Sequence, residues 1–237
     1  GNVVSLTAEN SITAANINGQ ISAETLNLTS TTGDIGALGA EILTAVQNLS
    51  MNSTLGDAYA INNGDVNLLA SSANGTLSLA TDGSLLGGAI TVTGAVSGFD
   101  VVLAAQNGSL FGNLNLNATV TANNNLDLDA DNDVTSNASG VLQGRFVNIN
   151  GVNSVTLNAA VTSTGPANTL DVLSNGAIAT NVGAVLSGAT INVQSTNSTV
   201  VIGEDVTGTG AGSVVTITAS GASPNGSVTT NAGADIT

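Results

Sequence analysis

Pairs of aliphatic residues separated by one residue recur along the chain at a nearly constant interval. Leu170-Asp-Val172 shows the complete unit, because the polar corner Ser174-Asn-Gly176 and then Ile178 follow it. The interval of 21–28 residues is typical of solenoids, which stack one repeat per turn. The pairs begin at Val4, Leu26, Leu49, Leu77, Val101, Leu126, Val147, Leu170, Ile191 and Val215.

The residue between the two members of each pair gives the register. Side chains alternate across a strand, so this middle residue points away from its two neighbours. Nine of the ten middle residues are polar, with Val102 as the exception, while the flanking residues are aliphatic apart from Met51. The pairs therefore point inward, and we expect an outward column of Ser5, Asn27, Ser50, Ser78, Val102, Asp127, Asn148, Asp171, Asn192 and Thr216.

Each repeat holds about three short strands joined by bends rich in Asn, Gly and Ser. The first repeat has one strand from Val4, a second from Ile12 and a third at Ile17 or Ile21. The sequence therefore predicts an all-β fold, a parallel β-solenoid of about ten rungs. The repeat runs without a break in composition, so we expect one domain over residues 1–237.

Two segments depart from the pattern. Leu38, Ile42, Val46 and Leu49 also fit a helical period, so a short helix at 37–47 is the alternative there. Residues 49–76 make the longest step, and we expect a protruding loop that carries Tyr59, the single tyrosine, before an extra strand begins at residue 66.

Composition supports a thin aliphatic core and excludes several partners. The chain has three Phe, one Tyr and no Trp. Its net charge is −15 and Arg145 is its one cation, which excludes binding to nucleic acid or to an anionic membrane. There is no Cys for disulfides or thiolate metal sites. No apolar run approaches the roughly 18 residues of a transmembrane helix.

Catalysis has few candidate groups. There is no His, so the catalytic triads that depend on it cannot form. Asp127, Asp129 and Asp131 would lie on one strand face, with neighbours about 6.6 Å apart, a spacing that suits an inverting carboxylate pair. Aromatic platforms and cations to orient a sugar are nearly absent. We therefore expect no enzyme, and a carbohydrate-active enzyme is the remote alternative.

The same acidic run is a better candidate for a cation. Asp127, Asp129, Asp131 and Asp133 offer the hard oxygen ligands that Ca²⁺ prefers. A solvated acidic strand is the alternative interpretation, and no other cofactor is expected.

The repeats resemble a known family. Val215-Thr-Ile-Thr-Ala219 followed by Asn225-Gly-Ser-Val228 is similar to repeats of filamentous-haemagglutinin-type exoproteins of two-partner secretion, and of autotransporter passenger domains. The resemblance implies a right-handed parallel β-helix that is secreted across a bacterial outer membrane and serves adhesion or surface structure.

We therefore expect an extracellular stalk or adhesion module at the cell surface, and a segment of a longer exoprotein. Its expected partners are flanking rungs or other copies of the chain, and glycans or receptors on host or other cell surfaces. The first alternative is a self-assembling filament subunit whose rungs stack head to tail, because no amphipathic helix caps the repeat.

Overall fold

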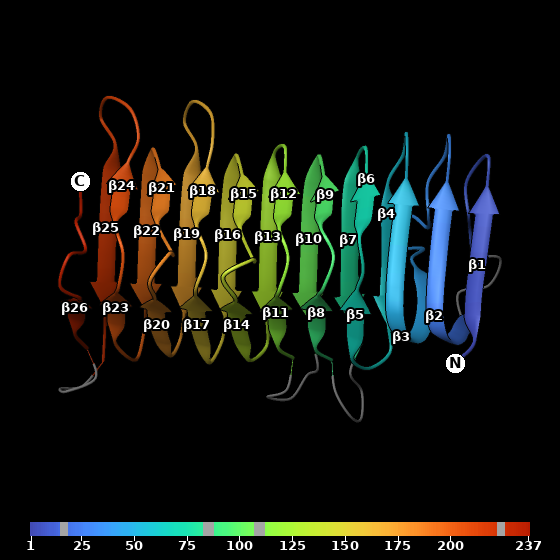
Figure 1. The fold of residues 1–237 in the computed structure, drawn as a ribbon, viewed down its shortest axis with the longest axis horizontal. Helices are drawn as coiled ribbons and strands as arrows, with labels where there is room; N and C mark the ends of the chain where they lie inside the picture. The colour runs from blue at the N-terminus through green and yellow to red at the C-terminus, as the bar shows by residue number, and fades with distance from the viewer. Residues whose placement is uncertain (15–18, 83–87, 107–111, 222–225) are drawn as a thin grey trace.

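The computed structural model describes residues 1–14, 19–82, 88–106, 112–221 and 226–237. Ile17 and Asn225, used in the patterns above, lie outside these ranges. Figure 1 shows the strands stacked side by side along the long axis, with the two termini at opposite ends. All pairings between named strands are parallel, and the described residues contain no helix, so the predicted parallel β-solenoid is confirmed.

The first three strands precede the strands that form three faces, here named A, B and C. These three are β1 (Val3–Ala8), which has six residues, and the longer β2 (Gln20–Ser30) and β3 (Ile42–Ser53), which have 11 and 12 residues. Face A contains β4 (Ala58–Asn62), β7 (Thr76–Thr81), β10 (Asp100–Ala105), β13 (Asn125–Ala130), β16 (Phe146–Gly151), β19 (Thr169–Ser174), β22 (Thr190–Ser195) and β25 (Val214–Ala219). Face B contains β5 (Val66–Leu68), β8 (Ile90–Val92), β11 (Leu114–Leu116), β14 (Asp133–Ser136), β17 (Ser154–Leu157), β20 (Ala177–Thr180), β23 (Val200–Ile202) and β26 (Val228–Thr230). Face C contains β6 (Ser71–Ala73), β9 (Val96–Gly98), β12 (Val120–Ala122), β15 (Leu142–Gly144), β18 (Val161–Ser163), β21 (Leu186–Gly188) and β24 (Val206–Gly208).

From β4 onward each strand pairs with the strand three further along, so a turn contains one strand from each face. One inward column follows face A through ten levels, and its nine steps make about nine turns of about 23 residues. Its members are Ile12, Ile35, Ala58, Leu77, Val101, Leu126, Val147, Leu170, Ile191 and Val215.

This column corrects the predicted register between the third and fourth pairs. Leu49 pairs with Leu68 on face B, whereas Leu77 pairs with Ala58 on face A. The long step from Leu49 to Leu77 therefore passes from one face to another and is not one turn. The aliphatic pattern hid this shift because β4 presents the small residues Ala58 and Ala60 to the core.

The protruding loop and the alternative helix are both wrong, whereas the extra strand from residue 66 is confirmed as β5. Tyr59 lies in β4, in the outward column beside Ser78. Residues 42–53 form strand β3 and not part of a helix. Leu38 is 82% exposed, whereas Ile42 and Val46 are buried. These residues therefore do not form the single buried face that an amphipathic helix would have.

Faces B and C diverge from one strand, β3. Strand β3 pairs with both β5 and β6: Leu49 lies beside Leu68, and Ser53 beside Ala73. The residues between β5 and β6 open a corner that separates face B from face C. Later turns retain this corner, because β8 and β9 continue the same two ladders.

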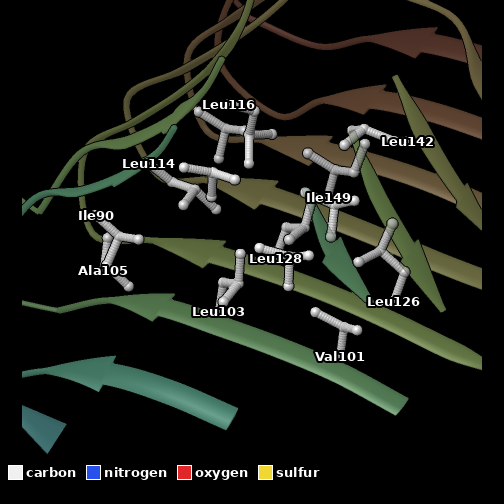
Figure 2. Close-up of a cluster of buried hydrophobic side chains, with 14 of the residues drawn as sticks. Ile90, Val101, Leu103, Ala105, Leu114, Leu116, Leu126, Leu128, Leu142 and Ile149 are labelled. Carbon is white, nitrogen blue, oxygen red and sulfur yellow. The ribbon is translucent and has the colours of Figure 1, made fainter. Parts of the chain in front are cut away.

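The core is one side chain deep and aliphatic. Figure 2 shows side chains from all three faces meeting inside the coil, among them Leu103, Leu114, Leu128 and Leu142. Along face A, inward aliphatic residues stack on aliphatic residues of the adjacent turns, as Leu128 does on Leu103 and Ile149. Stacking of this kind buries apolar surface that a single turn would leave exposed to water.

Inward polar residues satisfy backbone groups at the corners. The hydroxyls of Ser174 and Ser195 donate to the carbonyls of Gly151 and Gly176, each at 2.7 Å. Asn62 is fully buried, and its Oδ1 accepts hydrogen bonds from the Thr44 hydroxyl and from a backbone amide. In the described ranges every buried side-chain nitrogen and oxygen has a hydrogen-bond partner. The same ranges contain no helix that is long and apolar enough to cross a membrane.

Candidate functional site

Face A is the broadest surface of the solenoid. Its strands β7 to β25 are six residues long, whereas those of faces B and C have three or four. A six-residue strand presents three side chains outward, so face A has three outward columns. The middle column contains Tyr59, Ser78, Val102, Asp127, Asn148, Asp171, Asn192 and Thr216.

A groove of about 530 Å³ lies on this face and crosses six strands, from β4 to β19. Leu38 and Tyr59 line one end, and Thr169 and Asp171 line the other. Leu38 reaches this position from residues 36–41, which leave the ladder between Ile35 and Ile42 and are closed by a bridge between Ala37 and Ala40. Further lining residues are Thr76, Ser78, Asp100, Val102, Asn125, Leu126, Asp127, Phe146, Val147 and Asn148.

Three carboxylates border the groove. Asp100 accepts hydrogen bonds at 2.9 Å from the Asn124 side chain and from the Asn125 backbone amide. Asp127 accepts one at 2.8 Å from the Asn148 side chain in the next turn. The Asp171 side chain is half-buried and forms no hydrogen bond within the described part of the chain.

The aromatic side of the groove contains Phe146, beside the chain's one cation. The Arg145 guanidinium lies over the Phe146 ring, 4.9 Å from its centroid. A cation at this distance is attracted by the negative ring face. Within the ranges described, Arg145 forms no ion pair with a carboxylate.

The four predicted calcium ligands do not form one cluster. Asp127 and Asp129 point outward from β13 on face A, while Asp133 begins β14 on face B and Asp131 lies at the bend between them. Nowhere among the described residues do three metal-ligating side chains gather closely enough to hold an ion. Calcium binding by this acidic run remains a prediction.

Asparagine side chains already occupy part of this acidic run. Asn150 donates to Asp129 at 2.7 Å, and Asn153 and the Ser154 hydroxyl donate to Asp133 at 2.9 and 2.6 Å. Each donor comes from the turn that follows. These bonds stabilise the stacking of neighbouring turns and leave fewer oxygen lone pairs for a ligand.

Comparison with known proteins gives no match. No protein-family model, no curated protein and no solved structure matches the chain. The parallel β-solenoid is therefore established by the strand pairing, and the resemblance to two-partner-secretion exoproteins remains a prediction.

The sequence pattern predicted part of the groove and missed the rest. Asp127, Asn148 and Asp171 were expected in one outward column, and the structure places them there. Tyr59 and Phe146 were not expected in the groove. The signal for Tyr59 was the alternation Ala58-Tyr-Ala60, which lies 19 residues before Leu77-Ser-Leu79 and has the same inward and outward pattern.

Proposed function

We propose that this chain is a non-enzymatic, extracellular β-solenoid that serves as the stalk or adhesion module of a bacterial surface exoprotein. The observation that carries the proposal is the unbroken parallel pairing from β1 to β26 along one axis. Continuous backbone ladders and a stacked core make each turn depend on its neighbours, which suits a stiff spacer. Ten stacked levels at about 4.8 Å per step give a rod roughly 45 Å long.

The surface chemistry supports a location outside the cell. The outward columns consist mainly of hydroxyl, amide and carboxylate side chains, and the chain has no lysine and one arginine. A trypsin-like protease therefore has one cleavage site, between Arg145 and Phe146. Phe146 begins strand β16, where pairing to β13 and β19 restricts a protease's access to the backbone.

The adhesive part of the proposal concerns face A. The strands of this face are longer than those of faces B and C, and its groove is lined by both aromatic and acidic side chains. Grooves with an apolar base and a few convergent polar groups are common binding sites. The strands of faces B and C are shorter and present fewer outward side chains per turn.

Surface display tests this function. The chain is placed between an outer-membrane anchor and an epitope tag on a non-adherent bacterium, and bound cells are counted on an epithelial monolayer. We expect the displayed chain to increase adhesion over the anchor and tag alone. Equal adhesion by the two strains, at equal tag exposure, contradicts an adhesive role.

A register-preserving deletion tests the role as a spacer. Phe146, Thr169 and Thr190 occupy one column, so removing residues 146–189 deletes two whole turns and joins Arg145 to Thr190. We expect a folded rod shorter by about 9.6 Å in solution scattering. The matched control removes residues 149–191, which joins Asn148 directly to Asn192 inside one strand, so that two outward residues become neighbours and the alternation of that strand is broken. We expect this control to lose its cooperative folding. Equal folding of both deletions argues against a stacked spacer.

A self-assembling filament subunit is the second candidate, because the end turns expose apolar side chains. Leu6 is 37% exposed, while its partner Leu28 in the next turn is fully buried. Val228 is 43% exposed, while its partner Val200 is fully buried. Further turns of a longer chain or a second copy would cover these edges equally well. Fibres that form with increasing concentration would favour the filament.

A further inference from the structure

The groove on face A has a marked imbalance of charge. Asp100, Asp127 and Asp171 line it, and no basic residue is among its lining residues. The whole chain carries a net charge of −15, so an anionic ligand would be repelled over the full approach. A neutral ligand would cover carboxylates without supplying a countercharge, which carries a desolvation cost. Charge complementarity therefore favours a cationic ligand.

The apolar part of the groove suits the aliphatic stems of basic side chains. Leu38, Tyr59 and Phe146 line it, while the side chains of Leu126 and Val147 point into the core, so these two residues contribute only backbone to its base. Lysine and arginine pack their methylene groups against such surfaces while the charged end remains near water or a carboxylate. The Phe146 ring also attracts cations directly, as shown by the Arg145 guanidinium that lies 4.9 Å from its centroid.

The repeat also sets the spacing that a ligand must match. Asp127 and Asp171 occupy one column two turns apart, hence about 9.6 Å at the usual strand separation. Every third residue of a polyproline II segment lies on the same side, at intervals of about 9.3 Å. Six strands cross the groove, a span of about 24 Å. About eight residues in that conformation fill it.

We propose that the face A groove binds an extended basic segment of a partner protein, with lysine or arginine at every third position. This inference rests on the adhesive role proposed above and names its ligand class. Asp127 and Asp171 bind two successive cationic side chains, while Tyr59 and Phe146 pack against the stems and the proline rings.

A labelled peptide of three Lys-Pro-Pro repeats tests the inference by fluorescence anisotropy at low salt. The test variant combines Asp127→Asn and Asp171→Asn, and asparagine already occupies this column at positions 148 and 192. The matched control combines Glu9→Gln and Glu204→Gln, which removes two charges from residues that do not line the groove. We expect the test variant to bind about tenfold more weakly and the control to bind like the unchanged chain.

The variant Arg145→Gln should change the peptide affinity in the opposite direction. It removes the one positive charge beside the groove, so we expect this variant to bind the basic peptide about twofold more tightly. Circular dichroism of each variant establishes that its fold is retained before affinities are compared.

Three outcomes overturn the inference. The first is equal affinity for the test variant and the control. The second is equal or tighter binding of a Glu-Pro-Pro peptide, and the third is binding of a neutral β-glucan oligosaccharide without binding of the basic peptide. Cell adhesion by the displayed chain with no peptide binding would overturn this ligand class alone and leave the adhesive role intact.

Discussion

Replacing Leu128 by aspartate, and separately its neighbour Asp127 by serine, tests the register on which the fold depends. Leu128 has no exposed surface, and it lies between Leu103 and Ile149 of the adjacent turns. Asp127 points outward from the same strand. One position in the chain therefore separates a core residue from a solvated one.

The expected magnitudes differ widely. Truncating a fully buried leucine to alanine costs about 2–5 kcal/mol. For a chain of this length each kcal/mol lowers Tm by about 2–4 °C, so Leu128→Ala should lower Tm by about 10 °C. Leu128→Asp adds an unpaired carboxyl in an aliphatic core and should cost more. Asp127→Ser loses the 2.8 Å hydrogen bond from Asn148 and should cost about 1 kcal/mol.

The pH dependence of Leu128→Asp gives a second test. Burial raises the pKa of the introduced carboxyl in the folded state above its ordinary value of about 3.9. Both states hold the proton below about pH 4, so the variant is least destabilised there. As pH rises the unfolded chain ionises first, and each unit of difference between the two pKa values costs about 1.4 kcal/mol. Leu128→Ala should show no such added loss.

Thermal melts followed by far-ultraviolet circular dichroism measure these differences, at pH 4 and pH 7. Equal losses of Tm for Leu128→Asp and Asp127→Ser would refute the assigned inward and outward positions. Equal losses for Leu128→Asp at the two pH values would show that the carboxyl reaches water, so that the core is open at this turn.

Further predictions concern a polar corner, a close backbone contact and the end turns. Asn62→Leu removes both hydrogen bonds that Asn62 accepts from β3. Chemical denaturation should show a free energy of unfolding lower by about 3 kcal/mol. An unchanged free energy of unfolding would mean that the corner does not need these hydrogen bonds. Gly176→Ala places a methyl group against the Asn153 carbonyl oxygen and should lower Tm. The control Asn175→Ala loses only one exposed hydrogen bond, from Thr196, and should lower Tm less. Equal Tm values for the two variants would show that the corner can open to admit the methyl group. Across a dilution series, size-exclusion chromatography and electron microscopy should show that copies of the chain associate through the edges of β1 and β26. A chain that stays monomeric at every concentration, with its end-turn amides protected from hydrogen exchange, would exclude the filament.

The periodic pattern was enough to predict most of the fold. From Leu77 to Val215 the inward residues are aliphatic and the middle residues are mostly polar, and one-residue slips would bury those polar groups. The strand pairing follows this register in every turn of that range. Local alternation determines such a ladder because each turn stacks on a neighbour with the same pattern.

Only the tertiary structure decided which face each early strand joins. Leu49 and Leu77 have the same local pattern but lie on different faces, because Ala58 and Ala60 continue the face A column with small side chains. The groove depends on this placement: it brings Tyr59 beside Ser78, while residues 36–41 bring Leu38 to the same end. Contacts between turns depend on how many residues each corner takes up, and a local pattern of apolar and polar positions does not contain that information.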